Sequence, residues 1–154
     1  NDGPVALALS RQKLPVLDAA VNKGKLASGA YVLADCDGQP DVILISTGAE
    51  VHVTLAAQAA LAEKQIAARV VSMPSWELFE KQSAAYQASV LPPGIPRVSV
   101  EAGSPMGWAR YTGNNRAIIG IDTFGTSAPG NVVLKEYGFF AENIVAKVEA
   151  VLEK

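Results

Sequence analysis

The chain has 154 residues, of which 49% are hydrophobic and 18% charged, which favours one folded domain and excludes intrinsic disorder. Its 13 basic and 15 acidic side chains leave a net charge of −2, so it lacks the basic surface that nucleic acids select. No apolar run approaches the roughly 20 residues that span a bilayer. We therefore expect neither a nucleic-acid partner nor a membrane association. A lone cysteine, Cys36, and a lone histidine, His52, exclude an internal disulfide and a Cys/His zinc site.

The first third of the chain predicts strands. Val5–Leu9 is a short apolar run of the kind that forms a buried strand. The polar stretch Asn22–Gly29 follows and favours a domain boundary. Two further apolar runs, Ala30–Leu33 and Val42–Ile45, flank a turn at Asp35–Gly38. This arrangement predicts a hairpin that leads into a central strand.

Helices and strands alternate in the middle of the chain. Val51–Lys64 is rich in good helix formers and predicts a helix. Thr47 and Glu50 have the spacing of a capping box at its start. Arg69–Ser72 predicts the next strand, and Trp76–Val90 predicts one or two short helices.

The last third continues the alternation. We expect strands at Arg97–Val100 and Ala117–Ile121, with a short helix at Ser104–Tyr111 between them. A terminal helix, whose start near Phe140 lacks a capping side chain, is indicated by one apolar face: Ile144, Val145, Val148, Val151 and Leu152. The whole pattern predicts an α/β fold of three layers, in which a mostly parallel twisted sheet with one antiparallel strand carries helices on both faces.

Two candidate ligand or interface sites lie at carboxyl ends of predicted strands, where open α/β sheets place ligands. The turn from Thr47 to Glu50 enters a helix, and helix starts favour anions. Because Glu50 would repel an anion, we expect helix capping there, with anion binding as the alternative. Glu101 and Ser104 follow the predicted strand Arg97–Val100. The serine has no neighbouring histidine in the sequence to act as a base. We expect structural roles for both, a hydrogen-bonding carboxylate and a helix cap.

Three arginines are candidates for anion binding, because a guanidinium group can bind phosphate through bidentate hydrogen bonds. They are Arg11, Arg110 and Arg116. Arg11 is the best placed, since it directly follows the predicted strand Val5–Leu9. A plain surface charge is the alternative.

Five segments, in this order and at this spacing, closely resemble the C-terminal part of transketolase: Gly3–Pro15, Ile45–Val51, Arg69–Ser75, Val100–Gly103 and Phe124–Pro129. The resemblance covers essentially the whole chain. It implies a cytoplasmic, homodimeric enzyme that transfers two-carbon ketol units between phosphorylated sugars, using thiamine diphosphate and a divalent metal, Mg²⁺ or Ca²⁺. Residues 1–16 then correspond to the last strand of the pyrimidine-binding domain, 17–29 to a linker and 30–154 to the C-terminal domain.

The same resemblance assigns roles to particular residues. Arg11 matches the family's arginine that contacts the phosphate of the sugar substrate. The catalytic residues and metal ligands of the family belong to the upstream domains, so we expect a non-catalytic chain that binds no cofactor by itself. Because the chain starts with Asn1 and not with methionine, we expect a fragment of a longer protein. The alternative is a free-standing regulatory domain that binds a small anionic metabolite near Thr47 and Glu101.

Overall fold

The structure, a computed structural model, describes residues 3–4, 6, 9–10, 12–18 and 26–153. Of the strand expected over residues 5–9, only Ala6 and Leu9 are described, and both are exposed and outside any strand. The remaining residues of that expected strand fall outside the described part. Further along, Leu17 packs against the main core and so attaches the N-terminal stretch to the domain.

A five-stranded mixed sheet forms the centre of the domain, in the order β1-β3-β2-β4-β5. Neighbours among β2, β3, β4 and β5 pair in parallel, whereas β1 pairs with β3 in the antiparallel sense. The expected mostly parallel sheet with one antiparallel strand is thus confirmed. The strand bounds are β1 (Tyr31–Ala34), β2 (Val42–Ser46), β3 (Ala68–Ser72), β4 (Arg97–Val100) and β5 (Ile118–Ile119).

The expected hairpin between the first two of these strands is wrong. β1 pairs with β3, where Tyr31 faces Ser72 and Ala34 faces Val70. The reason lies in β2, which is buried at every position and therefore takes the centre of the sheet. There β3 and β4 occupy both of its hydrogen-bonding edges, so β1 adds to the free edge of β3.

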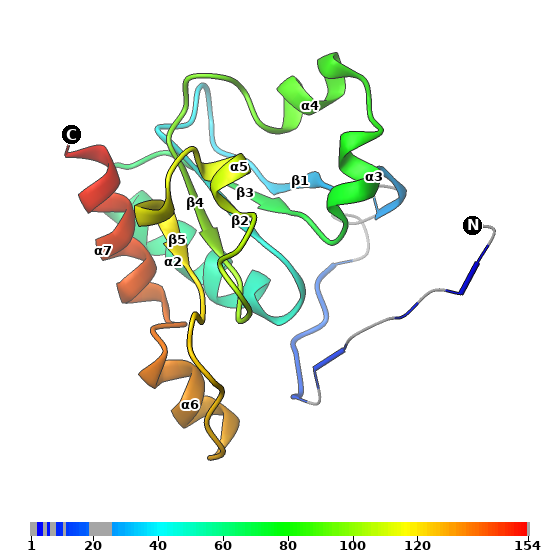
Figure 1. Cartoon of the computed structure of the whole chain (residues 1–154). Coiled ribbons are helices and arrows are strands. Elements are labelled where there is room, and N and C mark those ends of the chain that lie inside the picture. Colours follow the sequence, from blue (N-terminus) through cyan, green and yellow to red (C-terminus); the bar gives the residue numbers. More distant parts are fainter. Residues whose placement is uncertain (1–2, 5, 7–8, 11, 19–25, 154) are drawn as a thin grey trace.

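Helices cover both faces of the sheet, as expected (Figure 1). One face carries α2 (Val51–Glu63) and α7 (Ala141–Leu152). The other carries α3 (Trp76–Glu80), α4 (Ala84–Val90) and α5 (Ala109–Thr112). The short helix α6 (Gly130–Glu136) precedes α7, and 3-10 turns form at Leu26–Ser28, Gly48–Glu50 and Asn115–Ala117. Among the helices of the described residues, none is long and apolar enough to cross a membrane.

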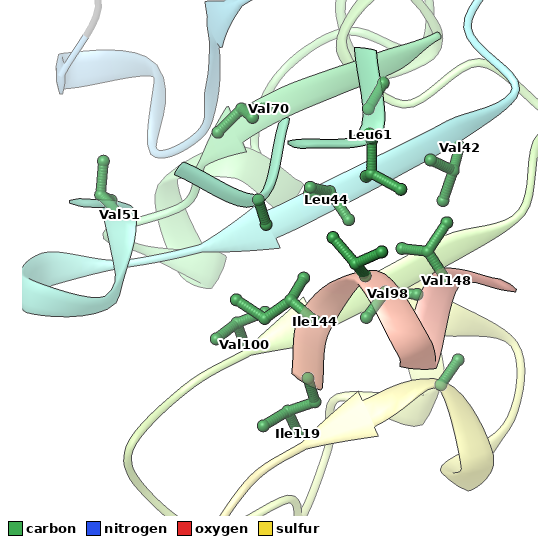
Figure 2. Close-up of a cluster of buried hydrophobic side chains, with 14 of the residues drawn as sticks. Val42, Leu44, Val51, Leu61, Val70, Val98, Val100, Ile119, Ile144 and Val148 are labelled. Atoms are coloured by element: carbon green, nitrogen blue, oxygen red, sulfur yellow. The ribbon is translucent and has the colours of Figure 1, made fainter. Parts of the chain in front are cut away.

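Successive side chains along each strand point to opposite faces of the sheet, so the buried side chains form two cores. Leu44 and Val98 face the larger core, where they meet Leu61 of α2 and Ile144 of α7 (Figure 2). The side chains at the neighbouring strand positions face the opposite way, into a smaller core. This core combines strand residues with aromatic residues of α3, of α5 and of the position before α5: Ile43, Ile45, Val71, Phe79, Trp108 and Tyr111. Because both faces of the strands are covered, the loops at the carboxyl edge start from a rigid platform.

Two boundaries and one additional helix in the last third of the chain differ from the sequence-based expectation. β5 ends at Ile119 and not at Ile121, because the loop after β4 lies against the following Gly120 and the N–H of Ile121 donates to the carbonyl of Gly103 over 2.8 Å. α5 begins only at Ala109. α6 was not expected at all, since it starts at a glycine and contains two adjacent valines, which are poor helix formers.

Candidate functional site

The carboxyl edge of the sheet brings Thr47, Glu50 and Glu101 together. Thr47 and Glu50 follow β2, Glu101 follows β4, and these parallel strands are direct neighbours with Ser46 opposite Val100. The segments that leave the two strands therefore emerge side by side. All three residues line one hollow of about 730 Å³. This arrangement agrees with the expectation that candidate ligand-binding side chains gather at the carboxyl edge of the sheet.

Glu50 is turned into the protein and forms no capping box. Thr47 precedes the 3-10 turn, but its side chain makes no capping hydrogen bond. The backbone N–H groups of Ala102 and of Glu50 itself lie close enough to the Glu50 carboxyl to favour its charged form. The residue is only 8% exposed, and burial raises the pKa of its carboxyl although these two N–H groups act in the opposite direction. Glu50 thus connects the β2 end to the β4 end, and the capping expectation is wrong.

Glu101 is the more perturbed of the two carboxyls. Its Oε2 atom is buried and has no hydrogen-bond partner among the described residues. Burial, followed by the nearby Glu50 charge, raises the pKa of Glu101 to about 7. Its backbone is held in place, because its N–H donates to the carbonyl of Ile119 over 3.0 Å. The site therefore contains a carboxyl group that loses its proton at a higher pH than an ordinary glutamate does.

Ser104 lies in an adjoining hollow of about 300 Å³, together with Thr47 and Glu101. Its hydroxyl accepts a hydrogen bond from the N–H of Met106 over 3.3 Å, which is a local turn. Since Trp108 is the residue that precedes α5, Ser104 does not cap that helix, and this expectation is wrong. The serine stays close to a carboxyl group but has no histidine beside it among the described lining residues.

The sequence-based reasoning missed the residues that α3 contributes to this adjoining hollow. Trp76 lies edge-on to Trp108, with ring centroids 5.0 Å apart. Glu77 accepts a hydrogen bond from the Ser75 hydroxyl over 3.1 Å. The signal was available, because Ser75 to Glu77 directly follow β3, whose carboxyl end lies at the same edge of the sheet.

The outer wall of the larger hollow comes from two distant parts of the chain. The segment around α6 contributes Thr126 and Ala128, and the N-terminal stretch contributes Ser10 and Gln12. Arg11, the leading candidate for anion binding, lies between these last two residues in the sequence but outside the described residues.

The other two arginine candidates do not reach this edge of the sheet. Arg110 pairs with Glu80 at 2.7 Å and lies over the ring of Tyr111. Arg116 belongs to the 3-10 turn before β5 and so stands at the amino end of that strand. Neither guanidinium is positioned to offset the two carboxyl groups.

The charge of the site opposes anion binding. Glu50 and Glu101 both line the larger hollow, and no lysine, arginine or histidine is among its described lining residues. Two carboxyl groups without a described basic partner offer a phosphate or a carboxylate no counter-charge, and they repel it once they are ionised. Among the described residues no group of three or more His, Cys, Asp or Glu side chains could hold a metal ion. The site therefore lacks the parts of a metal or phosphate centre within the described chain.

Comparison with known proteins decides the family. A family model described as the transketolase-like TK C-terminal domain matches residues 29–140. The chain belongs to this family. Transketolase 1 of Escherichia coli is 48% identical over 99% of the chain, and a transketolase of Halalkalibacterium halodurans is 46% identical over the same share. Each match spans only 23% of the relative, so the chain corresponds to less than a quarter of these proteins.

Solved structures agree with this result. A crystal structure of Pichia stipitis transketolase in complex with sedoheptulose 7-phosphate matches with a TM-score of 0.84 and 34% identity. The match covers 93% of this chain and 20% of that chain. Transketolase from Leishmania mexicana matches with a TM-score of 0.78 and 36% identity, over 84% of this chain and 18% of that chain.

The described residues of this transketolase C-terminal domain do not fit thiamine diphosphate and its metal. A diphosphate needs backbone N–H groups or basic side chains, and the carboxyl edge presents Glu50 and Glu101 instead. The β2–α2 junction holds a single glycine, Gly48, and no lysine. The described residues at this edge therefore offer a diphosphate no binding groups.

Proposed function

We propose that the chain is the non-catalytic C-terminal domain of a transketolase, an enzyme that transfers two-carbon ketol units between sugar phosphates. The observation that carries the proposal is the coverage of the matches. Nearly the whole chain aligns at 48% identity, yet it spans only 23% of a transketolase. The rest of the enzyme contributes the catalytic residues and binds thiamine diphosphate and a divalent metal, Mg²⁺ or Ca²⁺.

The partners of the domain follow from the same proposal. They are the upstream transketolase domains, in the same chain, and a second subunit in a cytoplasmic homodimer. Residues 1–16 complete the pyrimidine-binding domain, 17–29 form the linker and 30–154 form the C-terminal domain. The large apolar side chain of Phe124 is 99% exposed, which supports a neighbouring surface that covers it in the intact enzyme.

Within the intact enzyme, Arg11 binds the phosphate of the sugar substrate. Support comes from the Ser10-Arg11-Gln12 segment, which matches the transketolase motif, and from the two described residues beside Arg11. Ser10 and Gln12 both line the hollow at the carboxyl edge of the sheet, and because its described lining residues include no basic side chain, a phosphate there would depend on Arg11 for its counter-charge. A solved relative carries sedoheptulose 7-phosphate, a phosphorylated sugar of the required class.

A direct test uses the 154-residue chain alone. Isothermal calorimetry with thiamine diphosphate and Mg²⁺ should give no saturable heat, and the chain should transfer no ketol group from a sugar phosphate donor. Because the upstream domains are proposed to hold the cofactor, adding them back as the full-length enzyme should restore both. Cofactor binding by the chain alone at micromolar concentration would contradict the proposal.

The alternative of a free-standing regulatory domain for a small anionic metabolite meets an electrostatic obstacle. The hollow near Thr47 and Glu101 contains two carboxyl groups and no described basic side chain. Calorimetry of the same chain against nucleotides and sugar phosphates separates the two functions. Tight binding of one anion to the isolated chain would favour the regulatory function.

A further inference from the structure

Two carboxyl groups lie at the carboxyl edge of the sheet without a basic side chain among the described residues that line their hollow. Glu50 and Glu101 line the same hollow from adjacent parallel strands. Glu50 is 8% exposed, and the buried Oε2 of Glu101 has no hydrogen-bond partner among the described residues. A buried carboxylate oxygen without a donor is costly, and the simplest relief is a proton on the carboxyl group.

The charges around the pair do not offer another relief. Glu77 lines the adjoining hollow, where it adds negative charge and already accepts a hydrogen bond from Ser75. Neither hollow has a lysine, arginine or histidine among its described lining residues. Arg11 is the basic residue adjacent in sequence to the outer wall, and it lies outside the described residues.

We propose that Glu50 and Glu101 form a proton-binding pair whose full ionisation loosens the carboxyl edge of the sheet. The pair holds one proton in its closed state, and the proton passes to solvent when the Glu101 carboxyl becomes a carboxylate. Two negative charges then face each other in a partly buried space. They separate or admit water, and the loops that carry them lose part of their hydrogen bonding.

Three backbone amides report this opening. The N–H of Ala102 lies next to the Glu50 carboxyl. The N–H of Gly103 donates to the carbonyl of Glu101, and the N–H of Ile121 to that of Gly103, both over 2.8 Å. The contacts of Ala102 and Gly103 hold the loop after β4, and that of Ile121 links this loop to the segment after β5. They should break together when the pair ionises.

Amide hydrogen exchange of the 154-residue chain tests the proposal, with rates corrected for the intrinsic effect of pH. Loss of one proton raises the opening equilibrium constant by up to about tenfold per pH unit, between the ordinary carboxyl pKa and about 7. The three reporter amides should lose protection over this range. Amides of the central strand β2 should not, because they lie away from the pair.

Two variants and one control sharpen the test. Glu101→Gln keeps the shape without the ionisation, so the reporter amides should stay protected at all these pH values. Glu50→Gln removes the neighbouring charge and should move the transition to lower pH. Glu77→Gln, which removes a nearby carboxylate outside the pair, should leave the transition unchanged. An unchanged pH profile in Glu101→Gln would overturn the proposal.

A measurement on the unaltered chain covers the case in which a variant fails to fold. NMR of the glutamate carboxyl carbons follows each ionisation directly. We expect one of the two carboxyls to titrate near pH 7, in line with the pKa of Glu101. Titration of both carboxyls at the ordinary value of 4.5 would overturn the proposal.

Discussion

Arg69 and Asp35 form a two-pronged ion pair that fastens the antiparallel strand to the sheet. Nε of Arg69 donates to Oδ1 of Asp35 over 2.8 Å, and Nη2 donates to Oδ2 over 2.9 Å. The remaining Nη1 donates to the carbonyl of Ser89 over 2.8 Å. The Arg69 side chain is only 12% exposed. One guanidinium thus joins the turn after β1, strand β3 and the end of α4.

Arg69→Lys should lower the free energy of unfolding by about 1–2 kcal/mol, because an ammonium keeps the charge but loses the planar fork. Urea denaturation measures the change. The matched control is Lys64→Ala, which removes the exposed ion pair between Lys64 and Glu149. Exposed pairs contribute little, so the control should cost at most about 0.5 kcal/mol. Equal effects of the two variants would show that the bidentate geometry of the Arg69–Asp35 pair adds nothing to the free energy of unfolding.

Gly29→Ala should destabilise the domain strongly. Gly29 has a φ of +80°, and a Cβ there would lie 2.3 Å from the backbone nitrogen of Phe79 and 2.4 Å from the carbonyl oxygen of Ser75. Because both contacts involve backbone, we expect a loss above about 3 kcal/mol or failure to fold. Gly38→Ala is the control, with a φ of +75° and open space around it, and should cost about 1–2 kcal/mol. Thermal unfolding distinguishes the steric clash from the shared conformational cost.

Leu61→Ala should cost about 2–5 kcal/mol, the range for emptying a well-packed core site. Leu61 of α2 is fully buried among side chains of the sheet and of α7. Leu26→Ala removes the same atoms from a residue that is 63% exposed, and should change the free energy of unfolding by less than about 0.5 kcal/mol. A small effect at Leu61 in urea denaturation would mean that α2 is not packed as described.

Stability should fall as pH rises from about 5 to about 8. The folded chain holds a proton on Glu101 up to a pKa of about 7, whereas the unfolded carboxyl has the ordinary value of 4.5. The stabilisation is therefore fully present below the unfolded value and is lost as pH rises through the folded value. After allowance for solvent screening of a half-buried group, the loss should be about 1–2 kcal/mol.

Glu101→Gln should flatten this dependence in urea denaturation at each pH. An equal slope in the variant would place the titrating group elsewhere. A rise of stability with pH in the unaltered chain would contradict the assigned direction of the pKa.

Local sequence patterns predicted those helices and strands whose position in the fold does not depend on competition with other elements. Strand β3 and helix α7 follow from a β-branched run and from one apolar face, respectively, and both formed where expected. The pairing of β1 was not predictable in this way. The short turn after it favours a hairpin, but the complete burial of β2 reserves both of its edges for parallel partners.

The candidate site was predictable in position but not in detail. The rule that ligand-type residues gather at the carboxyl ends of strands placed Thr47, Glu50 and Glu101 together. The spacing of Thr47 and Glu50 favours capping, yet burial of Glu50 against the N–H of Ala102 determines its actual role. That contact joins two segments about fifty residues apart, so no local pattern contains it.

The proposed role of Arg11 in an intact transketolase is the most direct test of the account. The comparison is kcat/KM for a phosphorylated sugar and for a small unphosphorylated donor, in the full-length enzyme and in its Arg11→Ala variant. Loss of a charge-assisted contact worth about 1.5–3 kcal/mol should lower kcat/KM for the phosphorylated sugar roughly tenfold to a hundredfold. The unphosphorylated donor and thiamine diphosphate binding should be unaffected. Equal losses for both donors would show that Arg11 holds the fold or the domain junction, and would contradict the phosphate assignment.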